Sequence, residues 1–315
     1  MVTPDRTPDL SARVGTLSLK NPVMSASGTF GYGLEFAPFY DLSRLGALVV
    51  KGLSLQPTRG NPPQRIVETS AGMLNAIGLQ NIGVERFIAE AAPRLDDAGA
   101  VYVANIYGRT EEEYEAVARR LSGLPGLAAI ELNVSCPNVK QGGIAFGSTP
   151  EGLSGLTRRV RAATAKPLWV KLSPNVTDVG AMARAAEDAG ADAVTLINTL
   201  VGMAVDPRTR RPRLANVTGG LSGPAIKPVA LRMVWEACKA VKIPVVGIGG
   251  IQSAEDALEF LLVGASAVQV GTANFRNPNA CMEIIEGIRD FLAREKIRSV
   301  EEYRGGLLLP GERGG

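Results

Sequence analysis

Short apolar runs alternate with longer amphipathic stretches along most of this 315-residue chain. From Val23 onward each run is long enough for a buried strand and too short for a helix. This alternation is typical of βαβ units and a parallel sheet. We predict eight strands, at Val23–Ser27, Ala47–Lys51, Val101–Asn105, Ala129–Asn133, Leu168–Lys171, Ala193–Ile197, Val245–Gly247 and Ala267–Val270.

Helix start and stop signals fall between these runs. Thr110, before three glutamates, and Ser253 have the pattern of N-caps, and Pro150 stands where proline is favoured at a first helical position. Gly190 and Gly264 end helices just before the next strand. Eight such units favour a (β/α)8 barrel over an open sheet. No composition shift suggests a second domain, so we predict a single α/β barrel domain over residues 1–315.

Other segments add to the regular pattern. Residues 12–19 predict a short N-terminal hairpin before the first barrel strand. Long loops follow the second strand (53–83), the fourth strand (with Lys140–Gly143) and the sixth strand (199–224). The last of these carries an Asp206-Pro207 turn and a predicted hairpin. Ordered loops of this length are usually functional.

Polar residues stand where the predicted strands end, which is the active-site face of a barrel. They are Lys51, Asn105, Asn133, Lys171, Asn198 and Thr199. Buried amides and ammonium groups are costly without partners, so this set predicts a polar ligand. Lysines stabilise negative charge on a carbonyl-rich ring or a carboxylate. Amides pair with imide edges, because they donate and accept together.

Glycines after the last two predicted strands indicate that the ligand carries a phosphate. Gly249-Gly250 and Gly271-Thr272 occupy the loops that often form a phosphate site in barrels, and Ser222-Gly223 could complete it. Glycine lets backbone N–H groups approach an anion closely. Phosphate anchoring, imide recognition and an anion-stabilising lysine together suggest flavin mononucleotide (FMN). A barrel that binds a phosphorylated metabolite without flavin remains an alternative.

The stretch Asn133-Val134-Ser135-Cys136-Pro137-Asn138 supplies the candidate for proton chemistry. The chain has no histidine, which is the usual proton carrier near neutral pH. A thiolate can remove an acidic proton, so Cys136 is the leading candidate base. A structural turn is the competing interpretation, since proline and asparagine favour turns. If Cys136 is the base, Gly142-Gly143 would be the hinge of a lid that closes over the substrate.

Bulk properties exclude several classes. The net charge of +3 is small, and the arginines between 208 and 213 indicate a solvated hairpin tip rather than a nucleic-acid site. Three separated cysteines indicate a reducing compartment, with Cys238 and Cys281 as small buried hydrophobes. No Cys-x-x-Cys motif provides an iron–sulfur or zinc site, so we expect no metal. Without a signal peptide or a membrane-spanning run, we expect a cytoplasmic protein.

Three motifs together closely resemble the dihydroorotate dehydrogenases. They are Asn133–Asn138, Lys171-Leu172-Ser173-Pro174-Asn175 and Asn75-Ala76-Ile77-Gly78-Leu79-Gln80-Asn81. Cysteine as the base resembles class 1. The Asn75–Asn81 stretch and Ser27-Gly28-Thr29-Phe30-Gly31 resemble class 1B. The likeness spans about residues 13–294.

The resemblance implies an FMN-containing barrel that oxidises dihydroorotate to orotate in pyrimidine synthesis. Cys136 would take the proton from C5 while hydride passes from C6 to flavin N5. The implied FMN-binding residues are Ser27, Lys51, Gly52, Asn105, Asn133, Lys171, Ile197, Gly223, Gly249, Gly250, Gly271 and Thr272. The implied substrate-binding residues are Lys51, Asn75, Ala76, Ile77, Gly78, Leu79, Asn133, Asn198 and Thr199.

The resemblance also implies partners. Class 1B enzymes pass electrons to NAD through a second subunit that carries FAD and an iron–sulfur cluster, around a homodimeric core. A class 1A enzyme that uses fumarate, a reductase of uracil-type rings and a catalytically inactive assembly subunit are the alternatives. One departure is Gly52, where the family more often has Ser, Thr or Ala, so FMN affinity could be slightly lower.

Overall fold

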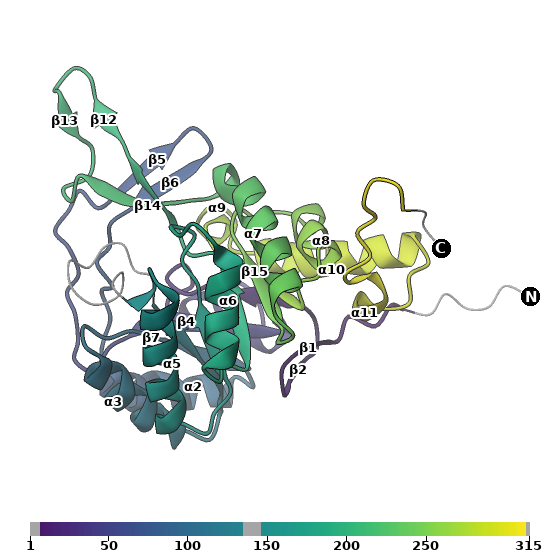
Figure 1. Ribbon diagram of the computed structural model, residues 1–315, viewed down its shortest axis with the longest axis horizontal. Coiled ribbons are helices and arrows are strands. Elements are labelled where there is room, and N and C mark those ends of the chain that lie inside the picture. The colour runs from purple at the N-terminus through teal and green to yellow at the C-terminus, as the bar shows by residue number, and fades with distance from the viewer. Residues whose placement is uncertain (1–6, 135–145, 313–315) are drawn as a thin grey trace, which may run out of the picture.

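The computed structural model in Figure 1 describes residues 7–134 and 146–312. Eight parallel strands close into a barrel in the order β10-β15-β16-β3-β4-β7-β8-β9. Their bounds are β3 Val23–Ser25, β4 Ala47–Leu53, β7 Tyr102–Ile106, β8 Leu127–Asn133, β9 Leu168–Lys171, β10 Ala193–Leu196, β15 Val245–Ile248 and β16 Ala267–Val270. The predicted (β/α)8 barrel is confirmed.

The strand ends differ from the predicted ones by a few residues. β4 continues to Leu53 because Leu53 pairs with Ile106 of β7, so Lys51 lies inside the strand and not at its end. β3 ends at Ser25, which places Ser27 in the following loop. These shifts arise because pairing with the neighbouring strand, rather than local composition, determines where a strand ends.

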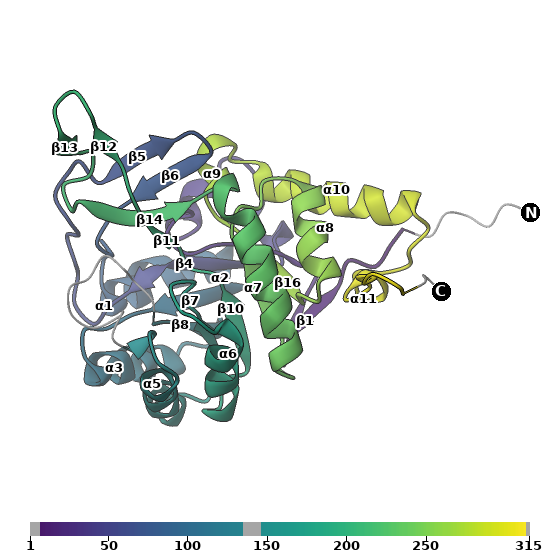
Figure 2. The same cartoon turned by 45° about the horizontal axis from the view of Figure 1, so that its top comes forward.

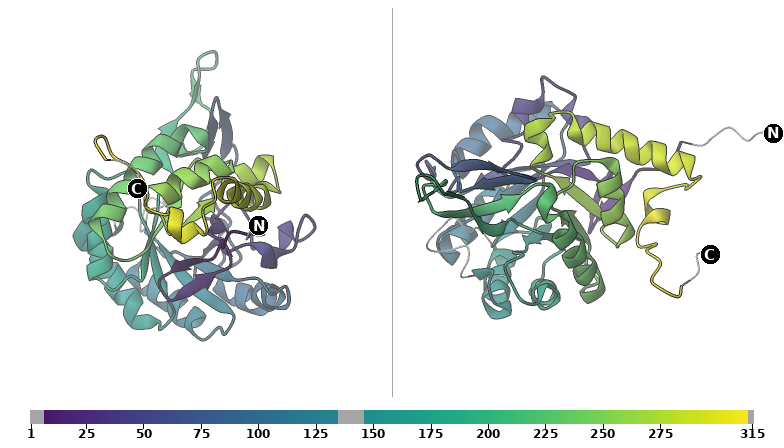
Figure 3. Two further views of the ribbon diagram at one scale, coloured as in Figure 1. Left: turned by 90° about the vertical axis from the view of Figure 1, so that its right-hand side faces the viewer. Right: turned by 90° about the horizontal axis from the view of Figure 1, so that it is seen from above.

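Helices surround the strands, as Figure 3 shows. The main ones are α2 Ala92–Asp97, α3 Glu111–Ser122, α5 Pro150–Ala163, α6 Val179–Asp188, α7 Lys227–Ala240, α8 Ala254–Leu262 and α10 Ala280–Arg294. Shorter pieces are α1 Val84–Arg86, the π-helical turn η3 Phe87–Ala91, α9 Ala273–Arg276, α11 Val300–Tyr303 and the 3₁₀ turns η1 Leu34–Phe36, η2 Leu42–Arg44 and η4 Pro224–Ile226.

The predicted helix signals are confirmed at three starts. The hydroxyl of Thr110 accepts a hydrogen bond from the N–H of Glu113, and Ser253 forms a capping box at α8. Pro150 opens α5. One unit departs from the expected alternation, because the fully described connection from β3 to β4 holds 3₁₀ turns and no α-helix.

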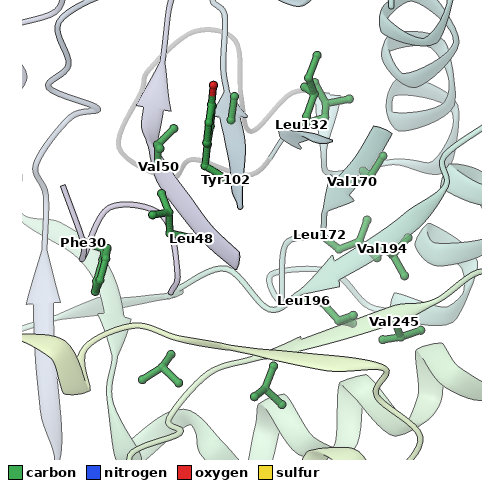
Figure 4. Packing of buried hydrophobic residues seen from close by; sticks show 14 of the residues in the cluster. Phe30, Leu48, Val50, Tyr102, Leu132, Val170, Leu172, Val194, Leu196 and Val245 are labelled. Atoms are coloured by element: carbon green, nitrogen blue, oxygen red, sulfur yellow. The ribbon is translucent and has the colours of Figure 1, made fainter. Parts of the chain in front are cut away.

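Side chains of each barrel strand alternate between two environments. Leu48 and Val50 of β4, and Val170 of β9, point outward and join the large core between strands and helices, part of which Figure 4 shows. This core extends around the barrel and holds the helices against it. Burial of apolar area at about 25 cal/mol per Å² makes it the main stabilising contribution.

The inward-facing side chains form two tiers. The lower tier is apolar and contains Val49, Val103, Ala129 and Trp169. It is closed below by the predicted N-terminal hairpin, whose strands are β1 Ala12–Val14 and β2 Leu17–Leu19. Two residues further along the same strands the inward positions become polar, since side chains repeat with a period of two. That upper tier contains Lys51, Asn105, Glu131, Lys171, Thr195 and Gln269, and Asn133 follows Glu131 two residues later on β8 and joins it.

The two long described loops combine into a second sheet. Strands β5 Ile66–Thr69 and β6 Gly72–Asn75 follow β4, and β11 Leu200–Met203 and β14 Thr218–Ser222 follow β10. They pair in the order β11-β14-β6-β5, with β14 beside β6. A hairpin of β12 Val205–Asp206 and β13 Arg211–Pro212 extends from it. Figures 1 and 2 show this sheet at the end of the molecule opposite the two termini.

The predicted Asp206-Pro207 turn forms the tip of this hairpin. The Asp206 carboxylate accepts from the N–H of Arg208 at 2.8 Å, and the arginines around it are exposed. The predicted hairpin is therefore present, and its arginines are exposed to solvent. Among the described helices, none combines the length and apolar character needed to cross a bilayer.

Candidate functional site

Lys171 lies at the centre of the upper tier. Its strand, β9, pairs with β8 and β10, which places Lys171 beside Asn133 and Thr195. The ammonium group donates to the hydroxyl of Ser27 at 3.3 Å and lies 3.8 Å from the carboxylate of Glu131. The lysine side chain is only 6% exposed. The structure thus brings the two predicted residues Ser27 and Lys171 together at the barrel mouth.

Glu131 was not predicted, yet it connects this tier. It lies on β8 and is fully buried. One carboxylate oxygen accepts from Asn105 Nδ2 at 2.7 Å. The other accepts from Thr195 Oγ1 at 2.9 Å and from Gln269 Nε2 at 2.7 Å. A buried carboxylate is tolerated because these donors and a nearby cation replace its hydration.

Three predicted asparagines form a row across strands β7, β8 and the end of β10. Asn133 Nδ2 donates to Asn105 Oδ1 at 3.4 Å, and Asn198 Nδ2 donates to Asn133 Oδ1 at 3.2 Å. Asn198 Oδ1 accepts from the N–H of Thr199 at 2.8 Å. The Asn133 carbonyl is held by the buried hydroxyl of Tyr114 at 2.8 Å. These contacts give amides on separate strands one shared orientation.

Lys51 and Gly52 lie next to this row. Lys51 is half-buried, and burial together with the charge of Arg65 lowers the pKa of its ammonium group. A Cβ on Gly52 would stand 2.9 Å from Asn105 Oδ1 and 3.9 Å from Leu79 Cδ2. The absence of a side chain at position 52 therefore leaves room for the Asn105 amide.

The Asn75–Asn81 segment approaches the mouth from the second sheet. Asn75 ends β6 and faces Gly220 of β14. Leu79 adopts a left-handed backbone with φ 59°, and its carbonyl accepts from Asn81 Nδ2 at 2.9 Å and from the Tyr107 hydroxyl at 3.2 Å. A strained residue held by two buried donors is typical of a binding loop. Ala76, Ile77 and Gly78 lie in this same loop.

The predicted glycine loops also converge. Gly223, Gly249 and Gly250 all have positive φ, which glycine adopts readily. A Cβ on Gly250 would stand 2.8 Å from the backbone nitrogen of Lys227. Thr272, just before α9, donates to the Ser222 hydroxyl at 2.8 Å. Loops from three strands therefore meet here. A Cβ on Gly223, Gly249 or Gly250 would stand less than 3 Å from another segment, so these glycines allow the predicted phosphate loops to pack closely.

The remaining predicted FMN residues border these loops. Ile197 lies beside Gly249, where an added Cβ would stand 3.3 Å from Ile197 Cγ1. A Cβ on Gly271 would stand 3.5 Å from Ala26 Cβ, which lies in the loop that leads to Ser27. The structure thus gathers the described predicted residues along one face of the barrel.

The candidate base and its hinge, Cys136 and Gly142-Gly143, lie outside the described residues. The other two cysteines are described. Cys281 is fully buried, and burial raises the pKa of its thiol to about 12. Cys238 is partly buried and packs against the core, and burial raises its pKa to about 12 as well. Neither thiol ionises near neutral pH, which agrees with the predicted structural role.

Glu131, Thr195 and Gln269 are the residues that sequence reasoning missed. A signal existed, because Glu131 stands two positions before Asn133 and therefore faces the same side of its strand. A carboxylate within an apolar strand also needs partners. The identity of those partners depends on strands that are far apart in the sequence, so local pattern could not supply it.

Fold and mouth together define a (β/α)8 barrel protein with an organised polar site at the carboxyl ends of its strands. A family profile described as dihydroorotate dehydrogenase matches residues 9–292. The chain belongs to the dihydroorotate dehydrogenase family.

Individual relatives agree. The "Dihydroorotate dehydrogenase B (NAD(+)), catalytic subunit" of Geotalea daltonii is 58% identical over 302 residues, covering 96% of this chain and 99% of that protein. The protein of the same name from Citrifermentans bemidjiense is 59% identical with the same coverage. The predicted likeness to class 1B catalytic subunits is thereby confirmed. The crystal structure of DHODH from Eimeria tenella in complex with ferulenol aligns with a TM-score of 0.79 at 22% identity, covering 97% of this chain and 90% of that one, which supports the fold.

Proposed function

We propose that this protein is the catalytic subunit of an NAD-linked dihydroorotate dehydrogenase, which oxidises dihydroorotate to orotate in pyrimidine synthesis. The observation that carries this proposal is the joined upper tier, in which Lys171, Ser27 and the asparagine row share one mouth. Its similarity to proteins named dihydroorotate dehydrogenase B over nearly the whole chain supports the choice of substrate.

FMN is the cofactor that these residues fit. Its phosphate would lie near Gly223, Gly249 and Gly250, because residues without side chains let backbone N–H groups approach an anion. The Lys171 ammonium would lie near the flavin ring and stabilise negative charge there. When bound, FMN supplies the acceptor for the hydride that leaves C6 of dihydroorotate.

The chain's own residues would bind the substrate and remove its proton. Lys51 would pair with the substrate carboxylate, and burial of this lysine strengthens such a pair by excluding water. Asn75, Asn133 and Asn198 would hydrogen-bond the carbonyl and N–H groups of the ring. Cys136 would take the C5 proton as a thiolate, in a chain without histidine.

Substitution at position 136 tests the base. Cys136→Ala should retain FMN and lose nearly all anaerobic flavin reduction by dihydroorotate. Cys136→Ser should react only at higher pH, because a hydroxyl is far harder to deprotonate than a thiol of pKa about 8.5. The measurement is stopped-flow flavin bleaching, and an unchanged half-reaction rate in Cys136→Ala would rule out Cys136 as the base.

The electron path would continue through a partner. We propose a homodimeric core joined by two subunits that carry FAD and an iron–sulfur cluster, which agrees with the NAD(+) and "subunit" in the relatives' name. An exposed apolar row of Val201 and Met203 on β11 and Val205 on the adjoining hairpin offers a surface for assembly. Reduced enzyme should not be reoxidised by NAD until the partner subunit is added. Rapid reoxidation by fumarate alone would favour a class 1A enzyme instead.

A further inference from the structure

The only carboxylate in the described upper tier, Glu131, makes hydrogen bonds in one direction only. Its oxygens accept from Asn105 Nδ2, Thr195 Oγ1 and Gln269 Nε2, and the Lys171 ammonium lies at 3.8 Å. We propose that Glu131 is a positioning residue that determines which way three asparagine amides face at the mouth. This inference rests on the proposed function, in which those amides bind the flavin and the substrate ring.

The direction is transmitted along the asparagine row. Since Glu131 only accepts, Asn105 must turn its Nδ2 toward the carboxylate and its Oδ1 toward Asn133. Asn133 must then donate to Asn105, which leaves its own Oδ1 to accept from Asn198. Each amide carries a donor on one side and an acceptor on the other, so fixing the first fixes the next.

The far end of the row imposes the same direction. Asn198 Oδ1 accepts from the backbone N–H of Thr199 at 2.8 Å, and a backbone N–H can only donate. An acceptor-only group at one end and a donor-only group at the other allow a single arrangement of the three amides. A reversed row would place the Asn105 amide oxygen against the Glu131 carboxylate at one end, and an Asn198 N–H group against the Thr199 N–H at the other.

This direction matters for ligand choice. Reversal would exchange donors for acceptors on every amide that faces the mouth. Dihydroorotate and the flavin imide both present carbonyl and N–H groups in fixed order, so a reversed row would mismatch them. A mismatched hydrogen bond in a desolvated site weakens binding by roughly tenfold to a hundredfold.

The variant Glu131→Gln tests the direction with almost no change in volume. One amide cannot accept from Asn105, Thr195 and Gln269 together, as the carboxylate does. With its Oε1 on Thr195 and Gln269, its Nε2 faces Asn105 and that amide turns over. We expect the FMN-loaded variant to bind orotate at least about tenfold more weakly by calorimetry. Thr157→Val is the control, because it removes a buried hydroxyl on α5 that lies outside the upper tier and makes no hydrogen bond among the described residues. Its orotate affinity should stay near that of the unmodified enzyme.

A second variant separates direction from packing. When Glu131→Gln is combined with Asn105→Asp, the new carboxylate at position 105 accepts from the new amide at position 131 and from Asn133, so Asn133 and Asn198 regain their direction. This double variant should bind orotate more tightly than Glu131→Gln alone. A merely structural role does not give that rescue. If Glu131→Gln does not fold, a folded double variant that binds orotate supports the proposal, and a double variant that also fails to fold overturns it.

Tests of the unmodified protein separate failure of the proposed function from failure of the role given to Glu131. Unmodified protein that takes up no FMN, or whose flavin dihydroorotate does not bleach, refutes the proposed function itself. Unmodified enzyme that passes both tests, with Glu131→Gln and Thr157→Val equal in orotate affinity, overturns only the role of Glu131. Absence of rescue in a folded double variant overturns it as well.

Discussion

Gly52→Ala is the substitution whose effect follows most directly from the geometry. The new Cβ would stand 2.9 Å from Asn105 Oδ1, about 0.5 Å closer than ordinary van der Waals contact. Asn105 is fully buried, and its Nδ2 is already bonded to Glu131 at 2.7 Å. The amide therefore has to rotate out of that hydrogen bond, or strand β4 has to shift.

The expected cost follows from these two routes. Overpacking a buried site costs about 1–3 kcal/mol. A distorted hydrogen bond to a charged acceptor costs about 1.5–3 kcal/mol. The substitution either shifts strand β4, distorts the Asn105 hydrogen bond, or does some of each. We therefore expect about 1–3 kcal/mol of destabilisation. Since Asn105 is a proposed FMN residue, we also expect flavin affinity to fall by about tenfold.

Two measurements check this expectation. Thermal unfolding of the FMN-loaded protein reports the stability, and fluorescence titration of the apoprotein with FMN reports the affinity. The control is Gly123→Ala, because a Cβ at Gly123 meets nothing within 4 Å and its φ of −82° suits alanine. If Gly52→Ala matches Gly123→Ala in both measurements, the Asn105 amide is not held as tightly as its contacts indicate, and the reasoning fails.

Three further substitutions test other parts of the structure. Lys171→Ala should weaken FMN binding and lower the flavin midpoint potential by about 30–60 mV in a spectroelectrochemical titration, since a charged contact of about 1.5–3 kcal/mol is lost from the reduced state; an unaltered potential would exclude that role. Burial and Arg65 lower the pKa of Lys51 below the 10.5 of an unperturbed lysine. Orotate affinity should therefore fall as pH rises through that lowered value, and Lys51→Gln should abolish this dependence; a flat wild-type profile up to pH 10.5 would contradict the assignment. The folded state binds fewer protons than the unfolded state between the lowered pKa and 10.5, so the contribution of Lys51 to stability rises with pH in that window. Gly155→Ala should stabilise α5 by about 0.5–1 kcal/mol, because this exposed helical position has nothing within 4 Å of an added Cβ. The corresponding rise in Tm is about 1 °C by calorimetry, and a lower Tm would contradict it.

Local sequence was sufficient for the barrel. Apolar runs of strand length, N-caps such as Thr110 and Ser253, and glycines that end helices are short-range signals. They predicted the eight strands because burial on both faces demands apolar residues wherever a strand lies. The single unit without an α-helix, between β3 and β4, escaped prediction because its 3₁₀ turns have no comparable periodic signal.

Local sequence also identified most of the candidate site, since residues at strand ends share one face of a barrel whatever their separation along the chain. Local sequence could not predict which side chains bind one another at the mouth, or which of them donates each hydrogen bond. Glu131 joins Asn105, Thr195 and Gln269 from three other strands, and the order β10-β15-β16-β3-β4-β7-β8-β9 brings them together only when the barrel closes. The pairing of β6 with β14, which carries Asn75 toward the mouth, likewise depends on two loops that are far apart in sequence. Spacing along the chain determines which side chains face inward, whereas hydrogen-bond direction depends on distances between strands, and only the tertiary structure sets those.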